Sequence, residues 1–201
     1  MDVDWGTILT SVFGSGGLGV AAFQYFSKRA SEKKTRHIQN SYARIAEVYR
    51  ALESIRAATR ANRVCVLKTE NGGGIPAPGC DVKSSVLYEN ADPKMPRELQ
   101  SCWQKVELNG VWAPLLHCLA VEGFANLTPN EKMGPHFDFL AESDCAKVHF
   151  VLIKLSEPAM FYLSVHLPDN IELSAYEAST MYQGARHIRQ LFDSRPQLIE
   201  E

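Results

Sequence analysis

Charged positions are absent from an early stretch of the chain, and this pattern predicts a helix in a membrane. No Asp, Glu, Lys or Arg occurs from Trp5 to Ser27, and about 20 apolar residues span roughly 30 Å of hydrocarbon. Trp5 and Phe26 suit the two interfaces. We therefore predict a membrane-anchor segment over residues 1–31. A flexible glycine-rich arm, or an apolar tail buried in a larger assembly, are the alternatives.

The charges on either side of this segment predict its orientation. Asp2 and Asp4 precede the uncharged run, whereas Lys28, Arg29 and further basic residues follow it. By the positive-inside rule, the N-terminus lies outside and the remainder of a single-pass protein is cytoplasmic. The acidic start also argues against a cleaved signal peptide, whose first residues are basic.

Residues 32–62 predict a helical stalk, because this segment is rich in helix formers and contains neither Gly nor Pro. Ile38, Ile45 and Leu52 recur every seven residues, and Val48 and Ile55 fill the intervening position. This stripe suits either a two-helix coiled coil or an amphipathic helix that packs on its own domain.

Small residues in the anchor add to the case for self-association. Ser11, Ser15 and Gly19 fall four apart and allow two helices to approach closely. We expect a homo-oligomer, most simply a parallel dimer, formed through the stalk and the anchor. The lipid bilayer is the other expected partner.

Residues 63–201 predict an α+β domain that begins with two strands. Val64–Thr69 and Val82–Glu89 have the extended pattern, and Gly72–Gly74 lies in the reversal between them. Helical spacing follows in two segments that are separated at Asn109-Gly110, and the stretch from Phe124 to Cys145 has the composition of a loop.

Two strongly apolar strands and a helix complete this domain. Lys147–Leu155 and Met160–Leu167 are joined by a short Pro-containing turn and predict a hairpin of central strands. Ser174 and Glu177 have the spacing of a capping box before a helix that ends at Asp193. The order of elements favours an antiparallel sheet flanked by helices.

Composition excludes one large class of partners. The formal net charge is -2 and the pI is about 6.3, so a general electrostatic affinity for nucleic acid is not expected. The five cysteines are dispersed and form no C-x-x-C pair, which is typical of reduced thiols rather than a disulfide framework.

The chain offers no recognisable catalytic or cofactor motif. The run "NGGGIPAPGCDVKSS" lacks the Lys of a phosphate-binding loop and leads into a strand, so we interpret it as a structural reversal. The close Cys/His pairs, His117-Cys118 and Cys145 with His149, belong to no four-ligand zinc set. His136, Asp138, Glu142 and Asp144 are interpreted as solvated surface. We therefore expect no metal, no cofactor and no enzymatic activity.

The assembled pattern resembles the GAF-type sensory domains, which belong to the PAS/GAF superfamily. The residues that carry the resemblance are "RVCVLKTENGGG", "SSVLYE", "KVHFVLIKLSEPAMFYLSVHL" and "ARHIRQLF", between Ile38 and Phe192. Domains of this kind begin with a long helix and close with a second helix beside it. The middle of this chain is short, and it has neither a bilin-attaching cysteine context nor an NKFDE-type nucleotide-binding set.

The resemblance implies a function in sensing or binding. In such a fold the ligand pocket lies on one face of the sheet, beneath the segment between the two pairs of strands. This position implies Tyr88, Trp103, Trp112, His117 and Phe137 as pocket residues, for a small-molecule ligand that the sequence does not identify. The alternative is a structural or interaction protein of a phage particle or a membrane-associated assembly.

Overall fold

The computed structural model describes residues 17–70, 82–95, 99–108, 110–130, 140–141, 144–156, 159–168 and 172–194. The chain divides into two compact units, Met1–Arg44 with Leu198–Glu201, and Ile45–Gln197. The glycine run Gly72–Gly74 and the proline-rich loop after it lie outside the described residues.

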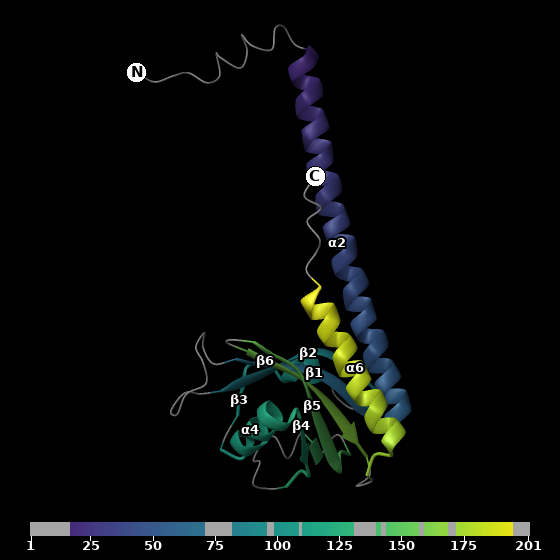
Figure 1. The fold of residues 1–201 in the computed structure, drawn as a ribbon, viewed down its shortest axis with the longest axis vertical. Helices are drawn as coiled ribbons and strands as arrows, with labels where there is room; N and C mark the ends of the chain where they lie inside the picture. The colour runs from purple at the N-terminus through teal and green to yellow at the C-terminus, as the bar shows by residue number, and fades with distance from the viewer. Residues whose placement is uncertain are drawn as a thin grey trace, which may run out of the picture. The chain divides into compact units, whose positions relative to one another are not determined.

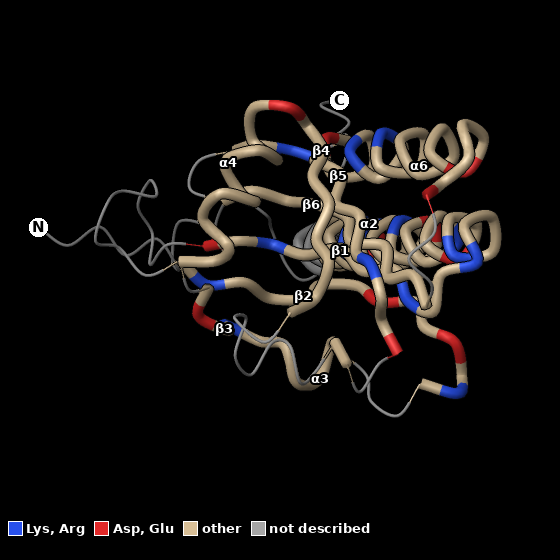
Figure 2. The backbone as a smooth tube through the Cα atoms, turned by 90° about the horizontal axis from the view of Figure 1, so that it is seen from below, with Lys and Arg blue, Asp and Glu red and all other residues tan. Residues whose placement is uncertain are grey.

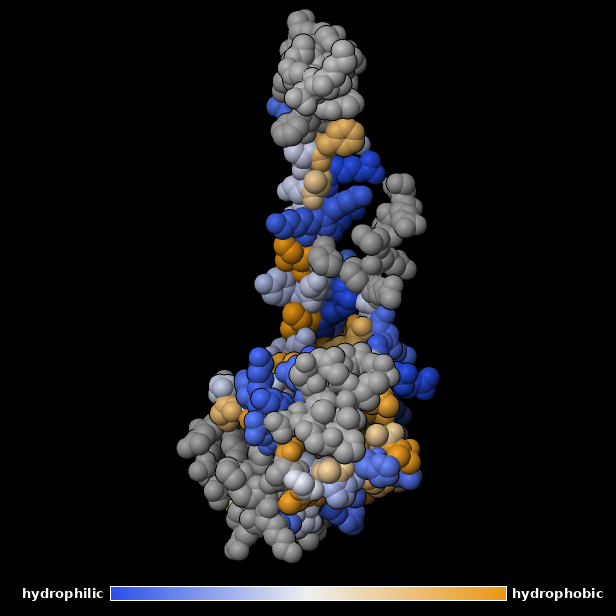
Figure 3. Space-filling view, turned by 90° about the vertical axis from the view of Figure 1, so that its left-hand side faces the viewer, coloured by the Kyte–Doolittle hydropathy of each residue, from blue (hydrophilic) through white to orange (hydrophobic). Residues whose placement is uncertain are grey.

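The first described element is the long helix α2, Gly17–Thr59, most of which belongs to the first unit. The large apolar side chains whose burial is described in that unit are exposed: Tyr25, Phe26, Ile38 and Tyr42. Apolar surface recurs at intervals along the helix between hydrophilic side chains (Figure 3). Within the described part of the chain, no helix has the length and apolarity needed to cross a bilayer. Residues 5–16 of the predicted span lie outside that part, so the anchor stays a prediction.

The C-terminal end of α2 belongs to the second unit, where its apolar stripe is buried. Val48, Leu52 and Ile55 are at most 2% exposed and pack in a core with strand residues such as Val66 and Leu163. The interpretation of the stripe as a helix that packs on its own domain is therefore confirmed for these residues. Self-association through the rest of the stripe stays a prediction.

The described strands form one six-stranded sheet, in the order β3-β2-β1-β6-β5-β4, and every neighbouring pair is antiparallel (Figures 1 and 2). The bounds are β1 Arg63–Glu70, β2 Lys83–Ala91, β3 Val106–Glu107, β4 Phe124–Leu127, β5 Lys147–Ser156 and β6 Ala159–Leu167. The predicted pairs β1/β2 and β5/β6 are confirmed. The predicted α+β class is confirmed as well, because helices flank this sheet.

Two predictions for the middle of the domain are wrong. Helical spacing predicts one helix through Leu99, Trp103 and Val106, but α3 covers only Leu99–Cys102, and Val106 lies in β3. The reason is the open edge of β2: Val86 N–H donates to the carbonyl of Trp103 at 2.9 Å, and β3 pairs with the start of β2. An unpaired sheet edge thus overrides helical periodicity.

The second error is β4, Phe124–Leu127, which lies in the segment interpreted as a loop. Four residues with one buried side chain, Ala125, carry too short an alternation to identify a strand from sequence. The partner explains the strand, because β4 satisfies the outer edge of β5, with Phe124 opposite Val151 and Leu127 opposite Val148.

The remaining helices lie on opposite faces of the sheet (Figure 1). Helix α4, Trp112–Glu122, ends at Gly123, whose φ of 79° is a left-handed conformation that favours glycine. Helix α6, Ala175–Asp193, starts with the predicted capping box, since Ser174 and Glu177 bond reciprocally to each other's backbone N–H. The C-terminal end of α2 and α6 cover one face and lie side by side (Figures 1 and 2).

Candidate functional site

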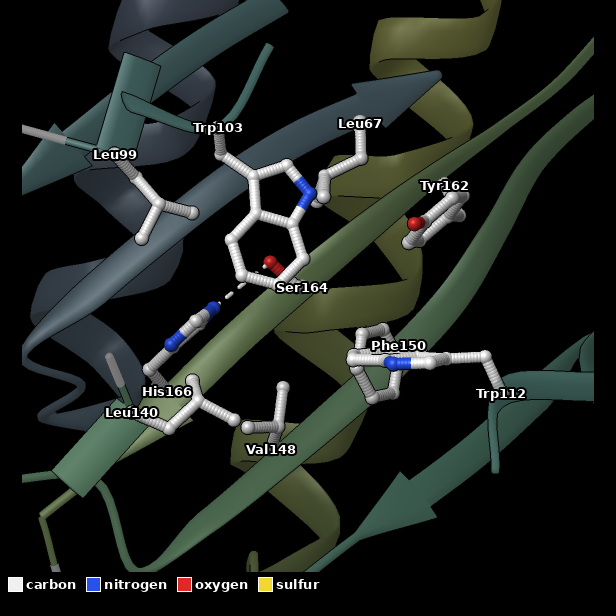
Figure 4. A pocket seen from close by; sticks show the side chains of 10 residues that line it. All are labelled: Leu67, Leu99, Trp103, Trp112, Leu140, Val148, Phe150, Tyr162, Ser164 and His166. Carbon is white, nitrogen blue, oxygen red and sulfur yellow. Dashed lines mark hydrogen bonds between the residues drawn. The ribbon is translucent and has the colours of Figure 1, made fainter. Parts of the chain in front are cut away.

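A small cavity lies between the other face of the sheet and the elements α3 and α4 (Figure 4). Its volume is about 20 Å³, enough for about one water molecule. Strand alternation selects the sheet residues that line it, because every second side chain of β1, β5 and β6 points to this face. The lining residues are Leu67, Leu99, Trp103, Trp112, Leu140, Val148, Phe150, Tyr162, Ser164 and His166.

Aromatic rings form one wall of the cavity. Trp103 and Trp112 meet edge to face with ring centroids 6.1 Å apart, and Trp112 meets Phe150 in the same way at 6.3 Å. Phe150 in turn lies 5.9 Å from Tyr162. The elements α3 and α4 form the cover of the cavity, and this series of ring contacts connects the cover to the strands beneath it. Each such pair stabilises the fold beyond its buried area.

A polar pair, Ser164 and His166, also lines the cavity (Figure 4). The two side chains are 1% and 5% exposed, and Ser164 Oγ lies 3.0 Å from His166 Nε2 in a hydrogen bond of either direction. The other ring nitrogen, His166 Nδ1, has no hydrogen-bond partner among the described residues. Burial, and secondarily the positive charge of Arg63, lower the pKa of His166 to about 3, so the imidazole is neutral at pH 7.

A buried ion pair lies on the same face of the sheet. Arg63 is fully buried, and its Nε lies 3.0 Å from Oε1 of Glu89, which is 5% exposed. Glu89 Oε2 accepts the backbone N–H of Gln100 at 2.6 Å. The carboxylate therefore connects β1, across the sheet, to α3 and the cover of the cavity.

Two more titratable groups of this face stay protonated. Burial, more than any charge, raises the pKa of Tyr162 to about 12, and its hydroxyl lies 2.9 Å from Ser84 Oγ. Burial also raises the pKa of the Cys65 thiol, and the negative charge of Glu89 adds to this effect. A buried, protonated thiol is a poor nucleophile, so Cys65 contributes packing rather than reactivity.

The structure places the five sequence-predicted pocket residues in different environments. Trp103 and Trp112 line the cavity. Tyr88 lies on the opposite face of the sheet, where its ring contacts Tyr49 and Phe192. His117 is on the exposed side of α4, and Phe137 lies outside the described residues.

Tyr88 is on the other face because of its register. It pairs with Val66, whose side chain packs beneath α2 and α6, whereas its neighbour Glu89 pairs with Cys65 on the cavity face. In α4 the buried positions are Trp112, Leu115 and Leu119, and His117 falls between them. A shift of one residue in a strand, or two in a helix, reverses the side that a residue faces.

Sequence reasoning missed Ser164 and His166. A signal was present, because "MFYLSVHL" is too apolar for a solvated strand and yet contains these two polar residues two positions apart. In a strand with both faces buried, residues at this spacing point to the same interior. Two buried polar side chains on one face require a partner or a ligand.

The described residues contain no group of three or more His, Cys, Asp or Glu side chains that could hold a metal ion. The groups that line the cavity are apolar, aromatic, or the neutral Ser164–His166 pair. Such an interior suits the binding of an apolar molecule with little charge.

Comparison with solved structures confirms the predicted GAF-like fold. A far-red cyanobacteriochrome photoreceptor is similar, with a TM-score of 0.55 and 12% identity over 84% of this chain and 96% of that chain. The phycocyanobilin-bound GAF domain of a cyanobacterial phytochrome has a TM-score of 0.51 and 14% identity, over 80% and 92% of the two chains. The GAF domain of a two-component sensor histidine kinase from Bacillus halodurans has a TM-score of 0.50 and 11% identity, over 73% and 90%.

These identities establish similarity of fold alone. No protein-family model matches the chain, and no curated protein matches it. The similarity to GAF domains therefore lies in the order of the strands, the two helices on one face of the sheet and the short elements on the other face.

Proposed function

We propose that the protein is a non-enzymatic sensing module that binds a small molecule between its sheet and the cover formed by α3 and α4. The observation that carries the proposal is the cavity at this position, which combines an aromatic wall with the buried pair Ser164 and His166. GAF-like neighbours such as the phycocyanobilin-bound domain support a binding role for a fold of this kind. Their ligands are not transferred to this chain, whose cavity is far smaller than a tetrapyrrole.

The path from cavity to helix supports a relay through α2. His166 lines the cavity with its side chain, and its backbone carbonyl accepts the N–H of Asn62 at 2.9 Å. Asn62 follows the end of α2 by three residues. On the same strand, Leu163 and Val165 pack in the core with Leu52 and Ile55 of α2. A ligand that moves β6 therefore moves the end of the helix.

We also propose that the N-terminal segment anchors the protein in a membrane, with the GAF-like domain in the cytoplasm and the chain self-associated through the exposed stripe of α2. The uncharged run and its basic flank support the anchor. The exposed side chains of Ile38 and Ile45 support self-association. Membrane fractionation of the full chain, with and without its first 27 residues, tests the anchor; recovery of both forms in the supernatant contradicts it.

The binding proposal is tested with the full chain in detergent. Denatured, purified protein is examined for a co-purifying small molecule by mass spectrometry, and intact protein is screened for ligand-dependent shifts in Tm, since a ligand that binds the folded state raises Tm. We expect Ser164→Val, which fills the cavity, to abolish binding. His117→Ala, on the exposed side of α4, is the matched control. A ligand that binds both variants equally contradicts the proposed position.

One observation favours a second candidate, a structural or interaction protein of a phage particle or a membrane-associated assembly. The interior is nearly filled, because the cavity holds about one water molecule. A packing module needs no larger space. A large, stable assembly in light scattering, together with no co-purified molecule and no ligand-dependent Tm shift, supports this alternative.

A further inference from the structure

His166 is buried, and one of its two ring nitrogens has no hydrogen-bond partner among the described residues. Its ring lines the cavity, and the side chain is 5% exposed. Nε2 is committed to Ser164 Oγ at 3.0 Å, and Nδ1 has no hydrogen-bond partner among the described residues. A buried polar atom without a partner is costly, and the ring that carries this atom lines the cavity. A molecule that enters this cavity and shifts its cover can therefore satisfy Nδ1.

Through Nδ1, His166 offers a ligand one such bond. In a neutral imidazole one nitrogen donates and the other accepts, so the direction of the bond between Ser164 and Nε2 decides whether Nδ1 offers a proton or a lone pair. In either case a single polar group on a ligand satisfies the hydrogen-bonding capacity of Nδ1. Ser164 Oγ bonds to His166 and the Tyr162 hydroxyl bonds to Ser84, whereas Nδ1 has no partner among the described residues.

The remaining walls require an apolar body. Leu67, Val148 and Phe150 line the cavity from the strands, and Leu99 and Leu140 line it from the other side. A hydrocarbon or aromatic ring loses nothing by desolvation against such walls, whereas each polar atom on the ligand needs a hydrogen-bond partner among the few polar groups of the lining.

Charge on the ligand is disfavoured. Arg63 and Glu89, the nearby buried charges, are paired with each other. His166 does not become a cation to receive an anion, because burial and Arg63 lower its pKa. A carboxylate or an ammonium group in the cavity would thus be desolvated without a new counter-charge.

We infer that the cavity takes a small neutral molecule with an apolar body and one hydrogen-bonding group, and that His166 Nδ1 is the atom that recognises this group. The inference rests on the proposed binding function and names the chemical class of its ligand. A molecule larger than water requires the cover to shift. Leu99 and Trp103 form this part of the cover, within and directly after α3, a helix of one turn.

Phenol and benzene are the probes, because they differ by one hydroxyl group. Their affinities for the full chain are measured by Tm shift and by titration of the imidazole ¹⁵N resonances. We expect phenol to bind the wild type about five- to tenfold more tightly than benzene, the value of one hydrogen bond. We also expect the Nδ1 resonance of His166 to move with phenol and not with benzene.

Two variants assign the effect to the proposed atom. His166→Leu should reduce the phenol-to-benzene ratio to about one. His149→Leu is the matched control: His149 is 4% exposed, lies on β5 facing away from the cavity, and has an Nε2 that lacks a partner among the described residues. It should keep the full ratio. The wild-type ¹⁵N titration answers the question by itself if either variant does not fold.

The outcomes separate this inference from the binding proposal. If both probes bind the wild type and His166→Leu with equal affinity, the cavity binds ligands but His166 does not select them, and the inference is wrong while the proposed function stands. If sodium benzoate binds more tightly than phenol, the neutral class is wrong. If no probe moves Tm or the ¹⁵N resonance, water alone satisfies Nδ1 and the inference is overturned. The proposed function is then decided by the search for a co-purified molecule.

Discussion

The two faces of the central sheet differ in chemistry although the same strands supply both. The face under α2 and α6 is filled mainly with aliphatic side chains such as Val66, Leu163 and Ile188, and His149 is a buried polar exception there. The cavity face combines Trp, Phe and Tyr rings with a buried ion pair, a buried histidine and two buried cysteines. An aliphatic interior contributes stability without directional demands, whereas the polar groups of the cavity face demand partners.

Strand β6 shows this division within four residues. Leu163 and Val165 pack beneath the helices, and Ser164 and His166 line the cavity. On the proposed function, the helix face holds the fold together and transmits movement, while the cavity face serves recognition. Four predictions test this division, beginning with the largest expected effect.

Replacement of Glu89 by Gln should be the most damaging of these changes. It removes the negative charge 3.0 Å from Arg63 Nε while the guanidinium stays fully buried. Breaking a buried pair from one side costs about 4 kcal/mol, because the remaining charge loses its compensation. Urea unfolding followed by circular dichroism measures the loss.

The double replacement Arg63→Met with Glu89→Leu is the control for this experiment. Two apolar residues of similar volume need no counter-charge, so the double variant should recover most of the stability lost in Glu89→Gln. If the double variant is instead the less stable of the two, the polar groups of the cavity face contribute to stability as the helix face does, and the division fails.

Leu52→Ala, on the helix face, should destabilise the protein by about 3 kcal/mol. Leu52 is fully buried in the core between α2 and the sheet, and truncation leaves a void that the rigid surroundings do not refill. Ile38→Ala is the matched control, since Ile38 has the same heptad position two repeats earlier and is 44% exposed. Its effect on a monomer should stay within about 0.5 kcal/mol. A large, concentration-dependent effect of Ile38→Ala would instead show that the stripe is buried in an oligomer.

The buried His166 on the cavity face should make the stability of the protein depend on pH. The pKa of His166 is lowered to about 3 in the folded protein, against 6.5 for the free side chain. The unfolded chain therefore binds the extra proton between these values, and stability falls as pH falls through this window, by up to about 1.4 kcal/mol per pH unit. His166→Leu should remove this part of the slope. Urea unfolding at pH 6.5 and pH 4.5 measures it, and an unchanged slope in the variant would place the titration elsewhere.

Much of the fold follows from the sequence because its largest elements carry complete periodic signals. The hairpin β5/β6 combines two long apolar runs with a short turn, and α6 begins with a capping box at Ser174 that side-chain chemistry alone identifies. Such local signals agree with the tertiary structure. The edge strands β3 and β4 have two and four residues, and their extended form depends on partners that the local sequence does not show.

The site was predictable only in part, because a site depends on which face each residue joins. Trp103 and Trp112 combine bulk with a position in the connecting segment, and they do line the cavity. Tyr88 was assigned to the wrong face, since a bulge after Val66 shifts the register between β1 and β2. His166 was harder to identify as a site residue than His117, because a histidine within an apolar strand has the same sequence pattern as any buried core residue.

The smallest predicted effect concerns the contact between the two helices of the helix face. A Cβ added at Gly184 in α6 would lie 2.4 Å from Cδ1 and 2.7 Å from Cγ1 of Ile55 in α2. Gly184→Ala gains up to about 1 kcal/mol of helix propensity, but overpacking a buried site costs about 1–3 kcal/mol. The expected net loss is about 1 kcal/mol.

A double-mutant cycle with Ile55→Ala isolates this contact. Ile55→Ala alone removes a side chain that is 1% exposed and leaves a void, and the methyl of Gly184→Ala then has room. The second substitution should therefore change from destabilising to neutral or stabilising, with a coupling of about 1 kcal/mol or more. If Gly184→Ala is equally destabilising with and without the isoleucine side chain, the two helices do not pack at this point. The aliphatic face would then be less tightly filled than its counterpart, and the cavity face would no longer be the part of the molecule with space to bind.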